Sequence, residues 1–283
     1  IGILLVGVLL VSGALDTGDI SNMDPLFKDG FAGITLVLVM VPFMFVGFDT
    51  IPQVAEEVDL PFRDIGVVLV VSVAMAIVWY GLIILAVGLV LDQAAIDASG
   101  TVTAEANARI YGEVGGTVLL VAGLAGIITS WNAFILGGSR AIYALANSGL
   151  LPKFLGELHP KYHTPKNAIL LLGALSAIGP FFGRPALVWV VNAGSLGIVI
   201  AYVMVAWSFL ILRQREPNLE RPYKVPFGEY LGRLALVLAI GITLLYLPGS
   251  PAALLWPQEW GIIMVWIFLG ACLYGVAQRG SGH

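Results

Sequence analysis

The feature that most constrains this chain is a series of apolar segments, each close to the length needed to cross a lipid bilayer. About 20 helical residues span the hydrocarbon core. Backbone groups in lipid find no water to bond, so only helices or closed barrels satisfy them. Runs of this length, in place of alternating strands of about ten residues, predict helices. The predicted spans are 31–56, 65–91, 115–146, 166–182, 186–212, 231–247 and 260–277.

The composition agrees with an all-α integral membrane protein whose main partner is the lipid bilayer. Charged residues make up 11% of the chain, against roughly 25% in soluble domains, and hydrophobic residues make up 59%. These values also exclude a disordered chain. The net charge of −4, without a basic stripe, argues against nucleic acid as a partner. The single cysteine, Cys272, excludes an internal disulfide and a cysteine metal site, and nothing indicates the oligomeric state.

The distribution of basic residues predicts which side of the membrane each connection faces, because Lys and Arg collect on the cytoplasmic side. If the chain emerges outside after residue 14, eleven of the fourteen basic residues fall on the inside. Lys28, Arg109 and Arg184 fall outside, together with the acidic stretches 16–29 and 92–113. We therefore expect a cytoplasmic C-terminus, and the cell membrane is the expected location.

The run 31–56 contains four residues that a plain membrane anchor would lack at this depth: Pro42, Gly47, Asp49 and Pro52. Gly47 lets the backbone leave helical geometry at little cost, and Pro52 cannot donate to the carbonyl four residues earlier. Thr50 followed by Gln53 matches a helix start, with Thr50 as the cap. The pattern predicts two half-helices joined by unwound backbone around 46–50.

Non-helical backbone at membrane depth is tolerated where it lines a cavity, and broken helices mark binding sites in secondary transporters. The last carbonyls of the outer half-helix, near 43–47, should attract an ammonium group, because a helix C-terminus carries negative partial charge. The amides near 50–53 favour an anion or Asp49 itself. The alternative is a structural helix with a proline kink, in which Asp49 caps the lower half.

Two other spans carry polar residues at depth. Thr129, Ser130 and Asn132 lie among glycines, where close helix packing is the first interpretation and a cation or substrate role the second. Asn192, Gly194, Ser195 and Gly197 interrupt the apolar run 186–212, where packing or a local kink is expected. Glu56 and Glu57 follow the broken helix as a solvated helix end or a gate contact.

Other function classes lack their usual signatures. His159 and His163 lie in a connection and His283 is terminal, so no histidine accompanies Asp49 and an intramembrane enzyme is disfavoured. An ion channel would also use unwound backbone, but it would normally show a selectivity element or rings of charge.

Several strings resemble amino acid permeases of the amino acid-polyamine-organocation superfamily. Gly47-Phe48-Asp49, then Ala55-Glu56-Glu57 and the string 61–65, resemble the sixth helix and the loop after it. The strings 139–146, 149–152, 159–162 and 164–165 resemble the eighth helix and its loop. The strings 215–217 and 221–226 resemble the segment after helix ten. Leu60 and Gly66 depart from the family's usual Asn and Pro.

The resemblance implies a LeuT-type fold, in which ten helices form a five-plus-five inverted repeat. By this likeness, residues 1–14 are a truncated helix five, and 31–212 form the second repeat, helices six to ten. Residues 213–230 form a cytoplasmic loop, and 231–283 form helices eleven and twelve with the C-terminus. Helices one to four, and with them half of the pocket, are absent from this sequence.

Carried over by position, the resemblance places the carbonyls of Phe43, Met44 and Val46 near a substrate amine. Gly47 and Asp49 are also implied to line the substrate site. Phe48 is implied as an aromatic wall or gate. Asn132 and Phe134 fall where the family lines the pocket. Thr129 and Ser130 fall where sodium-coupled relatives of the fold bind a cation. Proton-coupled members use a lysine on helix five, which the run 1–14 lacks, so both Na⁺ and H⁺ stay open as coupling ions.

The sequence thus predicts a secondary active transporter, a symporter or exchanger of amino acids or related small amines. It would work by alternating access, without covalent chemistry and without a cofactor beyond a coupling ion. The alternatives are a channel-like membrane protein or a fragment that is inactive by itself.

Overall fold

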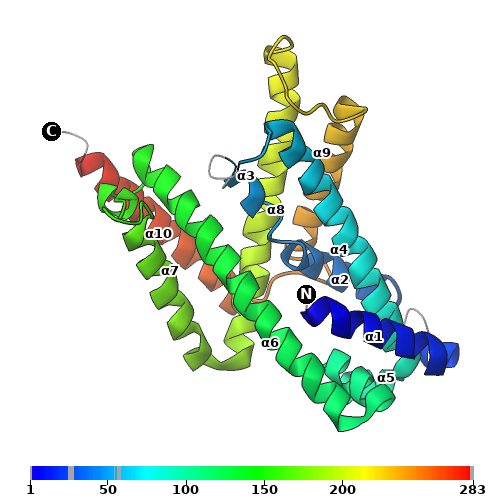
Figure 1. Cartoon of the computed structure of the whole chain (residues 1–283). Helices are drawn as coiled ribbons and strands as arrows, with labels where there is room; N and C mark the ends of the chain where they lie inside the picture. The colour runs from blue at the N-terminus through cyan, green and yellow to red at the C-terminus, as the bar shows by residue number, and fades with distance from the viewer. Residues whose placement is uncertain (1, 25–28, 54, 56–58, 281–283) are drawn as a thin grey trace. The chain divides into compact units, whose positions relative to one another are not determined.

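The chain is described by a computed structural model that covers residues 2–24, 29–53, 55 and 59–280. Every regular element in these ranges is helical, apart from one isolated β-bridge between Leu158 and Pro165. The α-helices are α1 (Gly2–Thr17), α2 (Gly30–Met44), α3 (Thr50–Gln53), α4 (Phe62–Val90), α5 (Gln93–Ala98), α6 (Val102–Asn147), α7 (Lys166–Ile178), α8 (Gly183–Arg215), α9 (Gly228–Leu245) and α10 (Gln258–Gly280). The 3₁₀ turns are η1 (Ile20–Met23), η2 (Lys153–Gly156) and η3 (Gly179–Phe182) (Figure 1).

Among the described residues, five helical stretches are long and apolar enough to cross a membrane: 62–90, 102–147, 166–215, 228–245 and 258–279. Two shorter apolar helices, α1 and α2, accompany them. The stretch 166–215 contains two predicted spans, because η3 and Gly183, whose φ is +75°, turn the chain between α7 and α8. Figure 1 shows α7 leading to this turn and α8 leading away from it. The helical content therefore agrees with the predicted all-α class.

The described residues form two compact units. One comprises 1–28 and 68–133, and the other comprises 29–67 and 134–283. The helices α4 and α6 each contribute to both units. Each unit has its own apolar core, and the two are described separately below.

In the first unit, α1 packs through a face of small residues. Leu10 and Ala14 are buried with Ala86 and Leu91 of α4 and Ala106 of α6. Elsewhere on α1, a Cβ placed on Gly13 would lie 2.8 Å from the hydroxyl oxygen of Tyr111, which donates to the Leu9 carbonyl at 2.8 Å. Helices approach this closely only where side chains are small.

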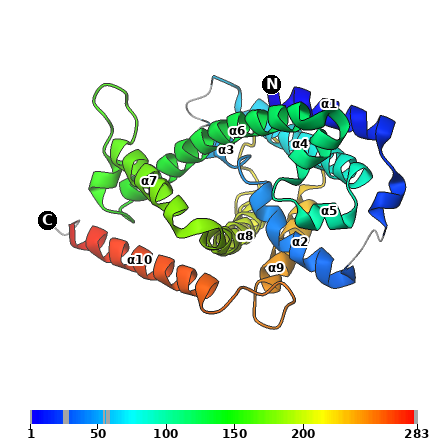
Figure 2. The same cartoon turned by 90° about the horizontal axis from the view of Figure 1, so that it is seen from below.

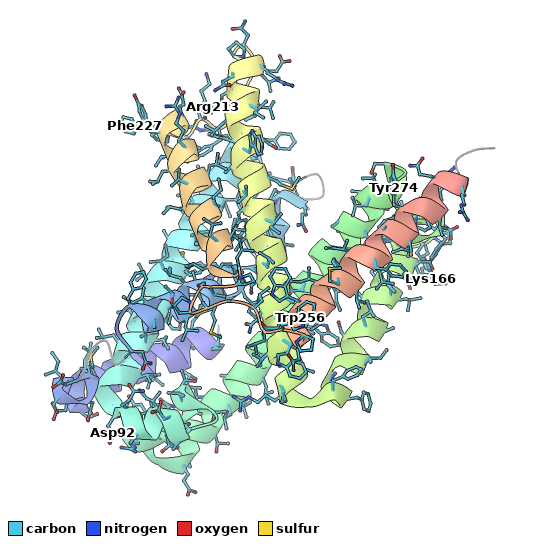
Figure 3. The ribbon with its side chains drawn as sticks, turned by 180° about the vertical axis from the view of Figure 1, so that it is seen from behind. Asp92, Lys166, Arg213, Phe227, Trp256 and Tyr274 are labelled. Atoms are coloured by element: carbon cyan, nitrogen blue, oxygen red, sulfur yellow. The ribbon has the colours of Figure 1, made fainter. Side chains whose placement is uncertain are left out.

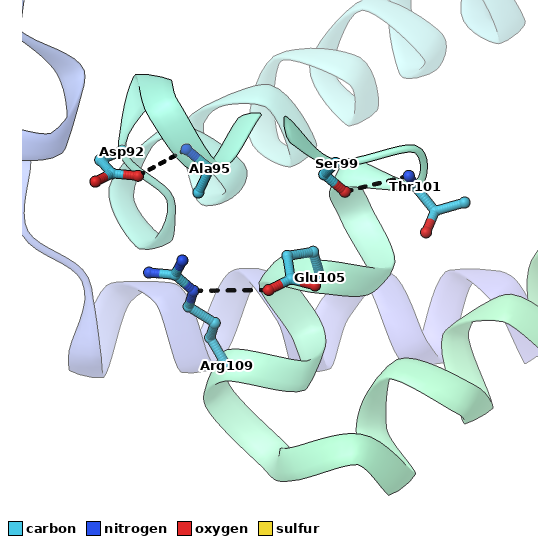
Figure 4. Close-up of polar contacts among 6 residues, drawn as sticks. All are labelled: Asp92, Ala95, Ser99, Thr101, Glu105 and Arg109. Carbon is cyan, nitrogen blue, oxygen red and sulfur yellow. Dashed lines mark hydrogen bonds and ion pairs between the residues drawn. The ribbon is translucent and has the colours of Figure 1, made fainter. Parts of the chain in front are cut away.

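The polar connection after α4 is more ordered than the sequence suggests. The acidic stretch 92–113, expected as a connection between spans, forms α5 and the first turns of α6. Asp92 caps α5 by accepting from the Ala95 amide at 2.9 Å, and Glu105 pairs with Arg109 at 3.9 Å (Figure 4). Gly112, with φ of +74°, marks a kink between this polar part of α6 and its apolar continuation. Burial of Ala106 explains why a polar stretch is helical here.

The turn between α1 and η1 is held to the end of α4. The amide of Asp19 and the side-chain amide of Asn22 both donate to the Leu89 carbonyl, each at 2.8 Å. The Asp19 carboxylate accepts the Ser21 amide at 2.9 Å, and this hydrogen bond lowers the pKa of Asp19. Local bonds of this kind fix a short connection that has no buried core.

In the second unit, α8 is the central element and packs against α2, α9 and α10. Figure 2 shows α8 almost end-on, with α2 and α9 beside it. The core contains Val39, Leu196, Val199 and Tyr246. The Tyr246 hydroxyl, fully buried, donates to the Val39 carbonyl at 2.7 Å, and this bond ties the end of α9 to α2.

The connection between α8 and α9 is organised by arginine side chains. Arg221 donates to the carbonyls of Glu216 and Leu219, both at 2.8 Å, and to the Leu212 carbonyl in the last turn of α8 at 3.3 Å. The Arg213 guanidinium lies over the Phe209 ring at 4.4 Å and covers Gly228 at the start of α9. Figure 3 shows Arg213 near Phe227 at one end of these helices and Trp256 at the other end of α9.

Candidate functional site

The backbone leaves helical geometry in the middle of the predicted span 31–56. The helix α2 ends at Met44, with Phe45 as its C-cap, and helical backbone resumes at Thr50. Gly47 has φ of +125°, a conformation that L side chains rarely adopt. Pro42 lies inside α2 and does not end it, since the helix continues to Met44. The interruption therefore coincides with Gly47 and not with the proline. Residues 45–49 form successive turns between the two helical pieces.

The turns are closed by short-range hydrogen bonds. The Val46 amide donates to the Phe43 carbonyl at 3.3 Å, and the Thr50 amide donates to the Gly47 carbonyl at 3.1 Å. The Ile51 amide donates to the Phe48 carbonyl at 3.2 Å. These bonds join residues three apart, so the segment is a tight series of turns in place of an α-helix. Through its hydrogen bond with the Thr50 amide, the Gly47 carbonyl connects the break to the first residue of α3.

The carboxylate of Asp49 turns back over the break. Its Oδ1 accepts a hydrogen bond from the Gly47 amide at 2.9 Å, and the residue is half-buried. We expected either the cap of the lower half-helix or a partner for its free amides. The structure shows instead that Asp49 stabilises the upstream glycine, whose positive φ leaves its amide outside the helical ladder.

An aromatic residue of α8 lies beside the break. The rings of Phe48 and Tyr202 have centroids 6.1 Å apart and planes tilted by 35°. The Tyr202 hydroxyl oxygen is buried, and no described residue forms a hydrogen bond with it. A buried tyrosine hydroxyl usually has a partner. Tyr202 therefore presents an unused polar group next to Phe48.

Tyr202 was missed by the sequence analysis. It lies in the apolar run 186–212, and its ring is as compatible with packing as with a site. Tyrosine in membrane helices is enriched at the two membrane interfaces. The position of Tyr202, away from the ends of its apolar run, was therefore the one feature of the sequence that could have indicated a functional role.

The short helix α3 lies directly against α6 at a glycine. A Cβ built on Gly137 would lie 2.6 Å from Gln53 Oε1 and 3.0 Å from Thr50 Oγ1. The expected capping box between Thr50 and Gln53 is not formed in the described part of the chain. Thr50 is instead the first residue of α3, since helical turns resume there.

The predicted residues on α6 fall into both units. Phe134 belongs to the unit that holds the break and is 43% exposed. Thr129, Ser130 and Asn132 belong to the other unit and are exposed. The Thr129 hydroxyl donates to the Gly126 carbonyl of its own helix at 2.8 Å. The pocket role of Asn132 and Phe134 and the cation role of Thr129 and Ser130 stay predictions.

The polar stretch of α8 serves packing and not a kink. The helix is continuous from Gly183 to Arg215, so Asn192, Gly194, Ser195 and Gly197 do not kink it. Asn192 donates to Glu259 of α10 at 2.7 Å, and Ser195 donates to the Val191 carbonyl of its own helix. Packing between helices, one of the two interpretations offered, therefore explains Asn192.

Glu56 and Glu57 lie outside the described residues, as does His283. Within the described ranges, no group of three or more His, Cys, Asp or Glu residues could hold a metal ion.

Comparison with known proteins places these features in context. The family model described as amino acid permease matches residues 1–273. The methylthioribose transporter of Bacillus subtilis and a branched-chain amino acid permease of the same organism are both 25% identical to this chain, each over 91% of it. A vacuolar cationic amino acid transporter of Arabidopsis thaliana is 30% identical over 81% of it.

The chain spans about half the length of the curated bacterial relatives, 53% of each, and 38% of the plant relative. Similarity therefore covers nearly all of this sequence but only part of each relative.

Proposed function

Since the chain belongs to the amino acid permease family and is an integral membrane protein, we propose that it forms part of a secondary active transporter of amino acids or related small amines. The observation that carries this proposal is the break at 45–49, where turn backbone interrupts the predicted span 31–56. Such interruptions belong to substrate sites in transporters.

We propose the following geometry for recognition. The end of α2 contributes the carbonyls of Phe43, Met44 and Val46, which carry the negative end of the helix dipole and attract the substrate ammonium. No described residue donates a hydrogen bond to the Val46 carbonyl. Phe48 covers the bound solute as a wall or gate. Tyr202 adds a hydroxyl that can bond a polar part of the substrate.

The larger arrangement is also proposed. The described helices correspond to late helix five through helix twelve of a LeuT-type fold, with 31–212 as the second inverted repeat. Alternating access would open the pocket to each side in turn, with Na⁺ at Thr129 and Ser130 or with H⁺ as coupling ion, or by exchange. The basic residues at the ends of α8 and α9 support a cytoplasmic face there and a cytoplasmic C-terminus in the cell membrane.

The substrate class rests on the relatives and the site together. Relatives transport methylthioribose, branched-chain amino acids or cationic amino acids, as their names state. A site built on backbone carbonyls recognises an amine without reading a side chain, which supports an amino acid or small amine as cargo.

Uptake by the whole protein in liposomes tests the proposal. We expect saturable, stereoselective uptake of at least one of radiolabelled leucine, arginine or alanine. Phe48→Ala and Asp49→Ala should reduce it by about ten-fold or more, because the first removes the cover of the turn and the second removes the acceptor of the Gly47 amide. Gly173→Ala is a matched control, since a Cβ there meets no atom within 4 Å. Non-saturable, non-stereoselective flux would indicate a channel, and no flux at all would refute transport of these solutes.

A further inference from the structure

The contact between α3 and α6 depends on the absence of a side chain at Gly137. This glycine is buried inside α6. A Cβ there would lie 3.2 Å from Thr50 Cγ2, in addition to 3.0 Å from Thr50 Oγ1 and 2.6 Å from Gln53 Oε1. The Gln53 side chain is long and can rotate away. Thr50 is short and branched at Cβ, so its atoms can retreat only if α3 itself moves.

A movement of Thr50 would be transmitted to the break. The Thr50 amide is bonded to the Gly47 carbonyl at 3.1 Å, and Thr50 follows Asp49, whose carboxylate holds the Gly47 amide. These bonds make residues 47–50 one small hydrogen-bonded unit. The surface of α6 at residue 137 is therefore a support for the turn that carries the predicted site.

Glycine at this position has no other evident benefit. Glycine is among the least favourable residues in a helix interior. At Gly194 and Gly197 of α8, a Cβ would meet no atom within 4 Å. At Gly138, the neighbour on α6, it would meet only the end of the Leu172 side chain, at 3.1 Å, which can adjust. Gly137 differs because its contacts include Thr50, the first residue of α3.

We propose that Gly137 is a positioning residue, which sets the distance between α6 and α3 and thereby the geometry of the substrate-binding turn 45–49. This inference rests on the proposed function. Gly137 touches no substrate itself and acts through Thr50.

The transport arm of the test uses the whole protein in liposomes with an amino acid that the wild type transports. Gly137→Ala should raise KM by about ten-fold and Gly137→Leu by about 100-fold, because small displacements of binding groups are costly. Thermal stability of Gly137→Ala should be unchanged or higher, since alanine is the better helix former. Gly194→Ala and Gly138→Ala should leave KM unchanged.

A suppressor separates positioning from general damage. Thr50→Ala removes both Thr50 atoms that a Cβ at residue 137 would meet. In the Thr50→Ala background, Gly137→Ala should therefore raise KM much less than it does in the wild type. An equal rise in both backgrounds would contradict the proposal.

A labelling arm does not depend on transport. Native cysteines, including Cys272, are replaced and Val46→Cys is introduced, and its rate of modification by a maleimide is measured. Gly137→Ala should change this rate several-fold, and Gly194→Ala should not. An unchanged rate overturns the proposal. A changed rate in a protein that moves none of the tested amines would support positioning and refute the proposed function.

Discussion

The buried carboxylate of Glu259 offers the sharpest test of how the second unit is held together. It is 1% exposed and accepts two hydrogen bonds, from the Asn192 side-chain amide and from the Leu255 amide, both at 2.7 Å. No ion pair with Glu259 is present among the described residues. The bond to Asn192 joins α8 to α10, and the bond to Leu255 closes the first turn of α10.

The cost of perturbing this arrangement follows from the number of partners lost. Glu259→Ala leaves two part-buried donors without their acceptor, at about 1 kcal/mol or more each. Asn192→Ala leaves a buried carboxylate with one hydrogen bond, at about 1.5–3 kcal/mol, the usual contribution of a hydrogen bond to a charged group. Asn192→Asp is expected to be the most damaging at neutral pH, because it places two carboxylates in contact.

Moving the carboxylate from residue 259 to residue 192 should restore the contact between α8 and α10. In the double variant Asn192→Asp with Glu259→Gln, the glutamine amide can donate to the new carboxylate, and its oxygen can still accept from Leu255. All three groups are then satisfied, with the charge on α8 instead of α10. The double variant should be more stable than Asn192→Asp alone by about 2 kcal/mol or more.

The assay is the apparent melting temperature of the whole protein in detergent, followed by intrinsic fluorescence. If the double variant melts no higher than Asn192→Asp, the assignment of these hydrogen bonds is wrong. Gly194→Ala, on the same helix with open space at its Cβ, is the control.

Three further outcomes are expected. Tyr246→Phe should cost about 1 kcal/mol, since it removes the hydroxyl that donates to Val39, and a melting midpoint equal to the wild type would contradict this. Arg221→Ala should lower the melting temperature by more than Arg215→Ala, because Arg221 donates to the Leu212 carbonyl in the last turn of α8 and to the C-cap Glu216. Tyr202→Phe should raise KM while keeping the ring against Phe48, and Tyr202→Ala should raise it further; a Tyr202→Phe variant with the KM of the wild type would argue against a role for the hydroxyl.

The sequence by itself determined the parts of this protein that depend on local chemistry. Long apolar runs must be helical in lipid, so the all-α class follows from hydropathy alone. Gly47 and Pro52 within one run indicated an interruption, because neither residue supports a continuous ladder of hydrogen bonds. The strings around Asp49 and after α8 indicated the permease family without any knowledge of packing.

Only the tertiary structure decided which residues meet. Tyr202 lies beside Phe48, Glu259 receives Asn192, and the base of α3 rests on Gly137, yet each pair is distant in sequence. Hydropathy assigns such residues only to a span, because the lipid-facing and protein-facing sides of a wholly apolar helix look alike in sequence. Which polar groups find partners depends on how helices pack, and packing is a property of the assembled surfaces.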